Sequence, residues 1–396
     1  MVGRGSSTPA PCTGGSYDYR MRLVVAIEGM FAFGGTERQA VDVAIGMNAR
    51  GHDVTVLSRW PLDVDNIYLN ELRERGVRVI SRGWGGPQRR RRVRVIASRA
   101  VSFGRVEALR GHAWRWQIGQ LRKLASEQPT VVHEIPFYGD VTPQGVAAHR
   151  RIRLPVVQTI LGTPSAPVQR AAPWAIMTSD GAPRVDGPGE WMWIPTMGPP
   201  DDPRPVRVSP KDGVWRAVFV GRMVAPKGAE LLIRAWAQLR GFPQLTVIGD
   251  GPGMAAVTKL VSELRANVVL AGALGRPEIL RELERAHLLV APSMLEDGVS
   301  FEGVPTVLAE GMWAGIPVVA SRVGGVERLF AADQPGWLVE PGDEQGLVDV
   351  LTAAMNPVAY SRAAHAARRV FDHLLAPGSV LDRYEVAYDR ALAAWA

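Results

Sequence analysis

A turn rich in glycine and cations follows a short apolar run in the second half of the chain. It begins at Gly221, reads GRMVAPKG over residues 221–228, and places Arg222 and Lys227 five residues apart. Arginine offers a planar fork to phosphate oxygens, and lysine offers a point charge that can follow a leaving group. The pattern is suited to a diphosphate; the alternative is a solvated loop between a strand and a helix.

Two further patterns lie downstream of this turn. The glycine turn that starts at Gly249, GDGPG, follows a second apolar run but lacks the full G-x-G-x-x-G spacing. Glu302 and Glu310 lie eight residues apart, and Gly303, Val304 and Pro305 follow the first of them. If Pro305 lies in the first turn of a helix, Glu302 precedes the helix and Glu310 lies about a turn and a half inside it. Two carboxylates placed in this way can accept hydrogen bonds from sugar hydroxyls; two solvated glutamates are the alternative.

The first half of the chain offers a phosphate site and a weak metal motif. Gly34, Gly35 and Thr36 precede a helical pattern, and the backbone N–H groups at such a helix start favour a phosphate. Asp63-Val64-Asp65 matches a D-x-D motif, but it follows a strand in the half that lacks the cationic turn, so we interpret it as structural. The seven histidines are scattered and the single cysteine is Cys12, so no zinc constellation or intramolecular disulfide is expected.

The elements that must position these residues alternate between strand and helix. Short apolar runs at 22–27, 53–58, 130–135 and 155–160 are separated by helical patterns, and the alternation restarts after a stretch with six prolines at 195–212. Such alternation predicts parallel sheets with helices on both faces. We therefore predict an α/β protein with two Rossmann-like domains that face a cleft.

The predicted boundaries follow from these changes in pattern. They are a disordered tail at 1–20, an N-terminal domain at 21–198, a linker at 199–212, a C-terminal domain at 213–378 and a final helix at 379–396. The final helix has apolar residues three or four apart, which lie on one face.

Taken in order, these motifs resemble the retaining GT-B glycosyltransferases of the glycosyltransferase family 4 type. The resemblance is carried by GR-x4-KG, GDGP, E-x7-E, GIPVVAS and VGGVERL, and by GGTERQAVDVAIGMNARGHDVTVLS near the start. It covers residues 21 to about 390, more strongly in the second domain. It implies a GT-B fold in which the last helix crosses back onto the first domain and the domains close over the donor.

The resemblance also implies roles for the motif residues. Arg222 and Lys227 would hold the diphosphate of a nucleotide-sugar, Glu302 would contact hydroxyls of the donor sugar, and Glu310 would bind the ribose. The remaining contacts would come from the glycine-bearing turns, the residues after Glu302 and the backbone near the base: Gly34, Gly35, Gly221, Gly249, Leu274, Gly303, Val304 and Pro305.

The implied activity is the transfer of a hexose-type sugar from a UDP- or GDP-sugar to a hydroxyl acceptor, with retention of anomeric configuration. No cofactor or metal is expected, because the cations already face the diphosphate. The family often carries H-x-H after the fourth strand, and here only His133 is present. We assign His133 a contact with the donor sugar, with a packed strand-end histidine as the alternative.

The charge distribution bears on the acceptor. The net charge is +7, yet Arg73–Lys123 alone carries 15 Lys and Arg against two acids. This region could meet an anionic membrane surface that holds a lipid-linked acceptor. We favour a small soluble acceptor from natural-product or glycoconjugate biosynthesis, because the arginines around 89–94 lack an amphipathic period. A non-catalytic sugar-nucleotide-binding protein and a nucleic-acid-binding protein are the alternatives from another class, and we expect no nucleic acid partner.

The composition and the longest apolar stretches restrict the class of protein. Hydrophobic residues make up 46% of the chain and charged residues 21%, which suits a protein with a sizeable core. No stretch approaches the about 20 apolar residues that a membrane-spanning helix needs, and residues 1–19 lack the apolar region of a signal peptide. We expect a cytoplasmic protein, with a peripheral position at the inner membrane face as the alternative.

Overall fold

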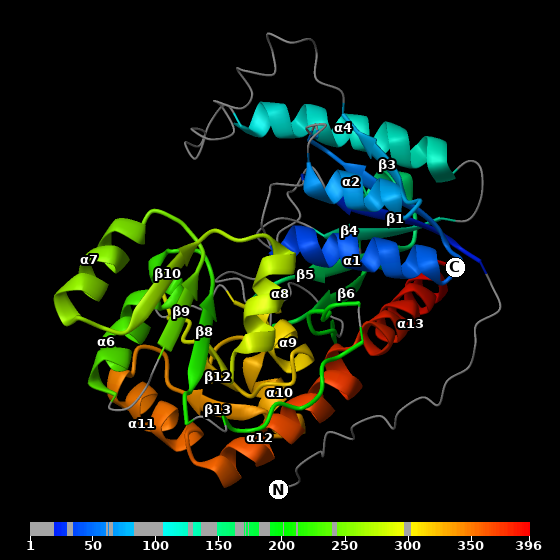
Figure 1. The fold of residues 1–396 in the computed structure, drawn as a ribbon. Coiled ribbons are helices and arrows are strands. Elements are labelled where there is room, and N and C mark those ends of the chain that lie inside the picture. Colours follow the sequence, from blue (N-terminus) through cyan, green and yellow to red (C-terminus); the bar gives the residue numbers. More distant parts are fainter. Residues whose placement is uncertain are drawn as a thin grey trace, which may run out of the picture.

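We analysed a computed structural model of the 396-residue chain. It describes residues 20–29, 35–60, 62, 66–82, 106–125, 130–135, 149–162, 170, 172, 174–181, 191–200, 202–210, 213–239, 244–296 and 302–396, with the side chains of 106–113 left out. Two parallel sheets, each with helices on both faces, make up these residues (Figure 1).

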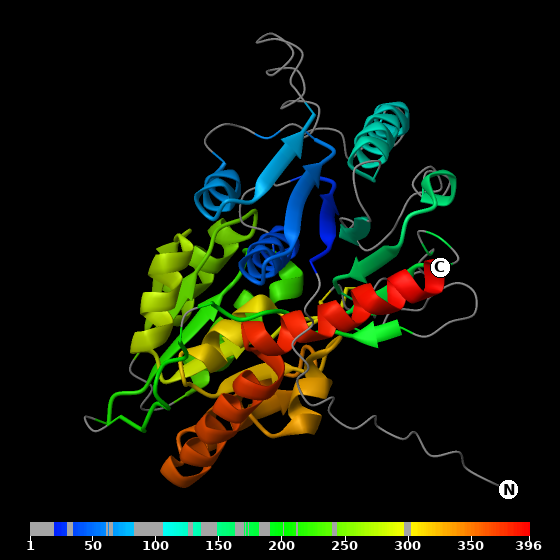
Figure 2. The same ribbon diagram turned by 90° about the vertical axis from the view of Figure 1, so that its right-hand side faces the viewer.

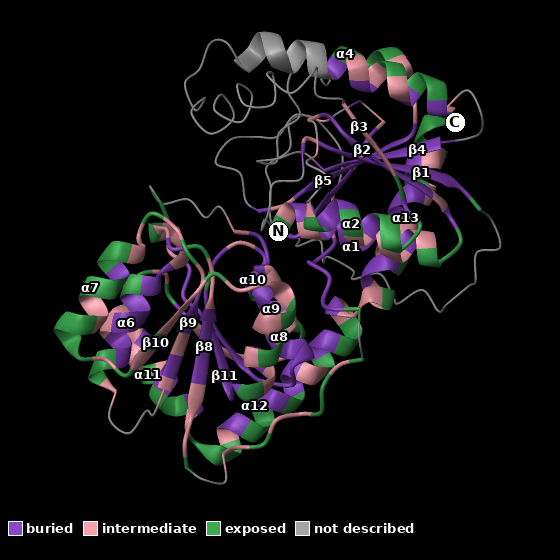
Figure 3. Ribbon diagram, turned by 45° about the horizontal axis from the view of Figure 1, so that its top comes forward, coloured by how far each residue is buried: buried purple, intermediate pink, exposed green. Residues whose placement is uncertain are grey.

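The N-terminal sheet has seven strands in the order β3-β2-β1-β4-β5-β6-β7 within the described residues, and all of its pairings are parallel. Its strands are β1 (Arg22–Ile27), β2 (Asp53–Ser58), β3 (Arg78–Ser81), β4 (Thr130–Ile135), β5 (Val156–Ile160), β6 (Ile176–Ser179) and β7 (Trp191–Trp193). The four central strands are short apolar runs that are buried on both faces, as parallel sheets require (Figure 3).

Alternate residues of these strands point to opposite sides and are covered by different helices. Leu23 and Val25 of β1 pack with α1 (Gly35–Ala49), α2 (Ile67–Glu74) and α13 (Pro377–Trp395). Val24 and Ala26 pack with α4 (Val106–Ala125) on the other face.

The C-terminal sheet has six parallel strands in the order β10-β9-β8-β11-β12-β13 within the described residues. These are β8 (Arg216–Val220), β9 (Gln244–Ile248), β10 (Val268–Gly272), β11 (Leu288–Ala291), β12 (Val318–Ser321) and β13 (Gly336–Val339). The order reverses between β8 and β11, and ligands of open α/β sheets bind beyond the carboxyl ends of strands at such a point.

Two groups of helices cover this second sheet. One face packs with α8 (Arg276–Arg285), α9 (Thr306–Trp313), α10 (Val326–Ala332) and α12 (Pro357–Val370). The other face packs with α6 (Ala229–Gln238), α7 (Met254–Leu264) and α11 (Glu344–Ala354).

The chain crosses between the domains twice. Residues 194–200 lead out of β7, and Gly198 N donates to the carbonyl oxygen of Leu375 at 2.8 Å. After α12, a five-residue turn, Phe371–Leu375, precedes α13, which lies beside α1 and the N-terminal sheet (Figures 1 and 2). The crossing of the last helix is therefore confirmed, although the helix begins at Pro377 and ends at Trp395.

The predicted α/β class with two Rossmann-like sheets is confirmed. The proline-rich segment predicted as a linker has no helix or strand at its described positions, but it is tied to the second domain: Arg204 N donates to the carbonyl oxygen of Trp313, and Arg207 N to that of Gly315, each at 2.8 Å. The pattern analysis did not anticipate β6 and β7, which have only four and three residues.

Candidate active site

The carboxyl ends of the two sheets face each other. Asp180 directly follows β6 of the first sheet, and its carboxylate accepts a hydrogen bond from Val304 N of the second domain. Gly35 at the start of α1 lies against Thr306 at the start of α9, since a Cβ on Gly35 would be 3.5 Å from Thr306 Cγ2. These contacts define one boundary between the domains.

The cationic turn after β8 is built around a left-handed glycine. Residues Ala225–Lys227 form a single 3₁₀ turn, which Gly228 ends with φ 72°. A Cβ on Gly228 would lie 1.9 Å from the carbonyl oxygen of Pro292, so both the backbone conformation and the close approach require glycine. Arg222 is exposed at the start of this turn, and Lys227 is three-quarters buried.

The second glycine turn packs directly on the first. Gly249 follows β9 with φ 136°, and a Cβ there would lie 1.9 Å from the carbonyl oxygen of Gly221. Gly221 N in turn donates to the carbonyl oxygen of Ile248 at 3.0 Å. These contacts fix the backbone next to Arg222.

The two predicted glutamates lie on either side of the start of α9. Glu302 forms an ion pair with Lys227 through Oε1 and Nζ. Pro305 is the residue just before the helix, whose first residue is Thr306. Glu310 is therefore only about one turn into α9, less deep than predicted, and its carboxylate lies 3.4 Å from the Nε atom of Arg276.

Two helix starts meet at the Gly35–Thr306 contact. A helix N-terminus carries about half a positive charge and unpaired backbone N–H groups. The starts of α1 and α9 are therefore suited to an anion that reaches both domains. Gly34, predicted beside Gly35, lies outside the described residues.

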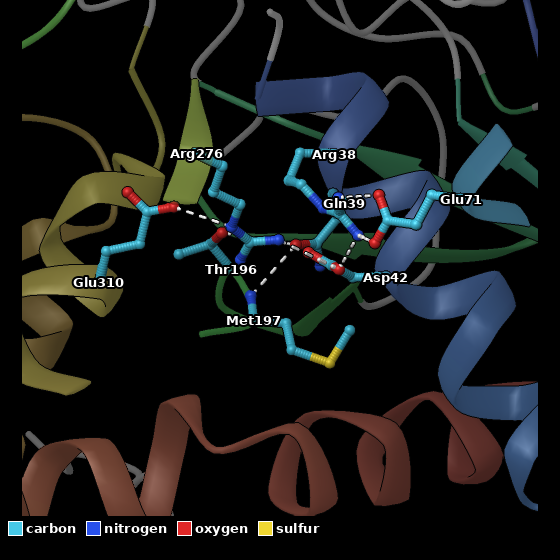
Figure 4. A network of polar contacts seen from close by, with 8 residues as sticks. All are labelled: Arg38, Gln39, Asp42, Glu71, Thr196, Met197, Arg276 and Glu310. Carbon is cyan, nitrogen blue, oxygen red and sulfur yellow. Dashed lines mark hydrogen bonds and ion pairs between the residues drawn. The ribbon is translucent and has the colours of Figure 1, made fainter. Parts of the chain in front are cut away.

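A polar network crosses the domain boundary beside Glu310 (Figure 4). Arg276 of α8 contacts Glu310 of its own domain and Asp42 of α1, with Nη1 3.6 Å from Asp42 Oδ1. Arg38 pairs with Asp42 and also with Glu71 of α2, at 2.6 Å to Oε2. The network thus joins both domains through three carboxylates and two guanidinium groups.

Burial dominates the protonation of two of these carboxylates. It raises the pKa of the Glu310 carboxyl to about 6, although Arg276 acts in the opposite direction. Burial also raises the pKa of Asp42, against the lowering effect of Arg38 and Arg276. Ionisation of Glu310 and Asp42 therefore costs free energy in the folded protein, and a bound ligand or a nearby cation can offset this cost.

His133 is packed inside the first domain, and its assigned contact with the donor sugar stays a prediction. Its ring is fully buried in β4, with Nδ1 2.9 Å from the Tyr388 hydroxyl and Nε2 2.6 Å from Thr159 Oγ1. Burial lowers the pKa of this imidazole to about 3. The ring is neutral and held between α13 and β5, which is the packed alternative named from the sequence.

The structure also gives positions for Leu274 and for two residues that were not predicted. Leu274 is partly buried between β10 and α8, two residues before Arg276. Arg276 and Asp180 were not predicted from the sequence. For Arg276, the available signal was a cation at a helix start, directly after Gly275. For Asp180, the signal was only a turn-like Ser-Asp-Gly sequence. Asp63 and Asp65 lie outside the described residues, and the described part of the chain holds no group of three metal-ligating side chains.

A small hollow lies on the first domain's side of the boundary, at the ends of β1 and β4 and the first turn of α1. It is lined by Ile27, Glu28, Gly29, Thr36, Glu37 and Ile135. The hollow is adjacent to the start of α1.

Comparisons with known proteins relate the second domain to one family. Residues 215–356 match the family model described as glycosyl transferases group 1. The amylovoran biosynthesis glycosyltransferase AmsK of Erwinia amylovora is 33% identical over 141 residues, which are 34% of this chain and 35% of AmsK. Glycogen synthase of Mycobacterium tuberculosis is 27% identical over 380 residues, 85% of this chain and 86% of that protein. The first relatives, AmsK among them, are thus matched over about a third of their own length.

Solved structures agree on the fold. A glycosyltransferase from Rickettsia africae has a TM-score of 0.70 at 14% identity, with 94% of this chain and 99% of that chain covered. Anabaena Alr3699/HepE in complex with UDP has a TM-score of 0.66 at 15% identity, with 93% and 100% covered. The match over residues 215–356 supports a group 1 glycosyltransferase, and the chain has the GT-B fold. Among the described helices, none combines the length and apolar character needed to cross a membrane.

Proposed function

We propose that this protein is a retaining glycosyltransferase that moves a hexose-type sugar from a nucleoside diphosphate sugar to a hydroxyl acceptor. One observation carries the proposal: the Lys227–Glu302 pair, Glu310 and the starts of α1 and α9 all meet where the two sheets face each other. The cation and the helix starts suit a diphosphate, and the carboxylates suit hydroxyls of a sugar and a ribose.

The proposed step breaks the bond between the anomeric carbon and the diphosphate oxygen, and forms a bond from that carbon to the acceptor oxygen. The acceptor proton passes to the departing phosphate oxygen, so no carboxylate nucleophile is needed. Negative charge develops on the diphosphate, where Lys227 and Arg222 stabilise it. Glu302, held by Lys227, binds the sugar and keeps it oriented.

The donor and acceptor are proposed by class. HepE was solved with UDP and with UDP-glucose. A relative from Mycolicibacterium smegmatis, 30% identical over 144 residues, is named a GDP-mannose-dependent mannosyltransferase. UDP- and GDP-sugars are therefore the donors to test first. The names of AmsK and of the teichuronic acid enzyme TuaC of Bacillus subtilis support an acceptor from polysaccharide or glycoconjugate synthesis.

We also propose that the reaction needs no metal ion. Mg²⁺ in phosphoryl and glycosyl transfer commonly neutralises the diphosphate, and here two side-chain cations and two helix starts supply positive charge to the same position. The functional assay is therefore run in EDTA. Loss of turnover on chelation, with recovery on adding Mg²⁺ or Mn²⁺, would contradict this part of the proposal.

The test begins with thermal shifts for UDP, GDP, dTDP, ADP and CDP, followed by turnover with the matching sugar nucleotides. The variant Lys227→Ala is expected to lower kcat about 100-fold while KM changes much less, because its charge acts mainly as the leaving group departs. Lys259→Ala is the matched control, since Lys259 is an exposed residue of α7 that forms an ion pair with Glu263 of the same helix. If Lys227→Ala changed KM alone, this would show that Lys227 does not stabilise the leaving group.

A further inference from the structure

Asp180 is a buried carboxylate that bonds to both domains. Its side chain follows β6 of the first sheet, and the residue is only 4% exposed. Oδ1 accepts from Gly162 N of the first domain at 2.8 Å, and Oδ2 accepts from Val304 N of the second domain at 3.1 Å. Both carboxylate oxygens are therefore engaged by backbone N–H groups, one on each side of the boundary.

Two glycines of the second domain approach Asp180 closely. A Cβ on Gly303 would lie 2.1 Å from Asp180 Oδ1, and a Cβ on Gly325 would lie 1.8 Å from the Asp180 carbonyl oxygen. Gly325 has φ −86°, which any residue can adopt, so space and not backbone conformation calls for glycine there. Gly325 N also donates to the carbonyl oxygen of Gly303 at 3.0 Å, which joins the two loops that enclose the carboxylate.

The position is electrostatically unfavourable for a carboxylate. Burial raises the pKa of Asp180 to about 6, and the nearby Glu302 carboxylate adds to this effect. A neutral asparagine of the same size would avoid this cost, but it has a single acceptor oxygen. The Gly162 and Val304 N–H groups each donate to a different carboxylate oxygen, so the amide NH₂ of an asparagine would face one of these two donors.

We propose that Asp180 is a positioning residue for the donor-sugar loop: by accepting from Val304 N, it fixes the backbone next to Glu302 when the first domain is docked. This inference rests on the proposed function, in which Glu302 meets the donor sugar. The first domain thereby takes part in donor-sugar binding without touching the sugar through Asp180. The nucleoside diphosphate is held elsewhere, by Glu310, Arg222 and Lys227, and does not need this contact.

The variant Asp180→Asn tests the inference by separating kcat from nucleotide binding. We expect kcat to fall at least about tenfold, the effect of losing one hydrogen bond to a charged group. The Kd for UDP or GDP alone, whichever binds, is expected to stay within about twofold of the wild-type value. The matched control is Asp343→Asn, because Asp343 also accepts from a backbone N–H, that of Gly346 at 2.8 Å, but at the exposed start of α11. The control should leave kcat and Kd unchanged.

A second readout does not depend on turnover. Hydrogen exchange of a peptide covering residues 302–308 should be faster in Asp180→Asn than in wild type and unchanged in Asp343→Asn. Wild-type kcat with unchanged exchange in a folded Asp180→Asn protein would overturn the inference. If Asp180→Asn does not fold, the variant Gly325→Ala is used, because its added methyl group contacts Asp180 from the other domain. Gly325→Ala should show the same loss of kcat and the same faster exchange. Wild-type kcat and exchange in Gly325→Ala would also overturn the inference. A wild-type protein that neither binds nor turns over any donor would instead overturn the proposed function, while hydrogen exchange would still report on Asp180.

Discussion

Glu310 has to satisfy two opposing demands. In the proposed function its carboxylate accepts from ribose hydroxyls and must be charged to do so strongly, yet it is 13% exposed and its ionised form is disfavoured by burial. The pKa of Glu310 in the folded protein is about 6, above the ordinary 4.5. Below pH 4.5 the group is neutral in both the folded and the unfolded state, so the protein has the full stability that the neutral group allows. This stability is lost as the pH rises past about 6 and the buried group ionises. At pH 8 the ionised group thus costs about 2 kcal/mol relative to its neutral form.

This conflict predicts a trade between stability and binding in Glu310→Gln. At pH 8 the variant is expected to gain up to about 2 kcal/mol in free energy of unfolding, because the buried charge is gone. Its Kd for the nucleoside diphosphate should rise at least about tenfold, since hydrogen bonds to a charged acceptor are lost. Urea unfolding at pH 5 and pH 8 and calorimetric titration measure the two effects. Glu263→Gln on the exposed side of α7 is the control, and tight nucleotide binding by Glu310→Gln would place the ribose elsewhere.

At this scale, the resemblance of the motifs implied a shared donor site for Lys227, Glu302 and Glu310, and each of these residues lies at a fixed offset from a turn or helix start within one domain. Arg276 and Asp180 escaped prediction for a shared reason. Their partners, Asp42 and Val304, belong to the other domain, and no local pattern reports a contact that exists only after two domains have docked.

At the scale of elements, α13 determines the environment of His133. Tyr388 is fully buried on this helix and bonds to His133 of β4, and Tyr384 packs 5.0 Å from the same ring. Periodicity correctly placed both tyrosines on one face of the last helix, and the short apolar runs correctly placed β4. The strand pattern could not show that this face of α13 covers His133, because strand and helix are far apart in sequence. β6 and β7 were missed since they are too short to show a period.

Tyr388→Phe tests whether His133 is a packing residue. The substitution removes the hydroxyl and leaves Nδ1 of His133 buried without that partner, which is expected to lower the free energy of unfolding by about 1–3 kcal/mol. Turnover per folded molecule should stay near wild type. Tyr360→Phe is the matched control, because the Tyr360 hydroxyl is buried with no hydrogen-bond partner among the described residues, and its removal should be neutral or stabilising. A large loss of kcat without a loss of stability in Tyr388→Phe would return His133 to the active site.

For the whole molecule, Arg276 joins the proposed nucleotide site to the domain boundary. Its side chain is 24% exposed, and its guanidinium group lies between Glu310 of the second domain and Asp42 of the first. Ribose hydroxyls at Glu310 would change one half of this contact, while the half with Asp42 would remain. Domain docking and the proposed nucleotide binding therefore involve the same cation.

Arg276→Ala should accordingly destabilise the docked protein in a pH-dependent manner. The variant leaves the Glu310 and Asp42 carboxylates without this cation, and at pH 8 the loss is expected to reach about 3 kcal/mol, as for a buried pair with one partner removed. At pH 5 the loss should be smaller, because the Glu310 carboxyl, with a pKa of about 6, takes up a proton as the pH falls, and burial also raises the pKa of Asp42. Arg281→Ala removes an exposed arginine of the same helix, paired with Glu278, and should change stability by no more than about 0.5 kcal/mol at either pH. Urea unfolding of both variants at pH 5 and pH 8 gives the comparison. Equal losses for Arg276→Ala at the two pH values would mean that Arg276 contributes by packing, and that its charge does not hold the two domains together.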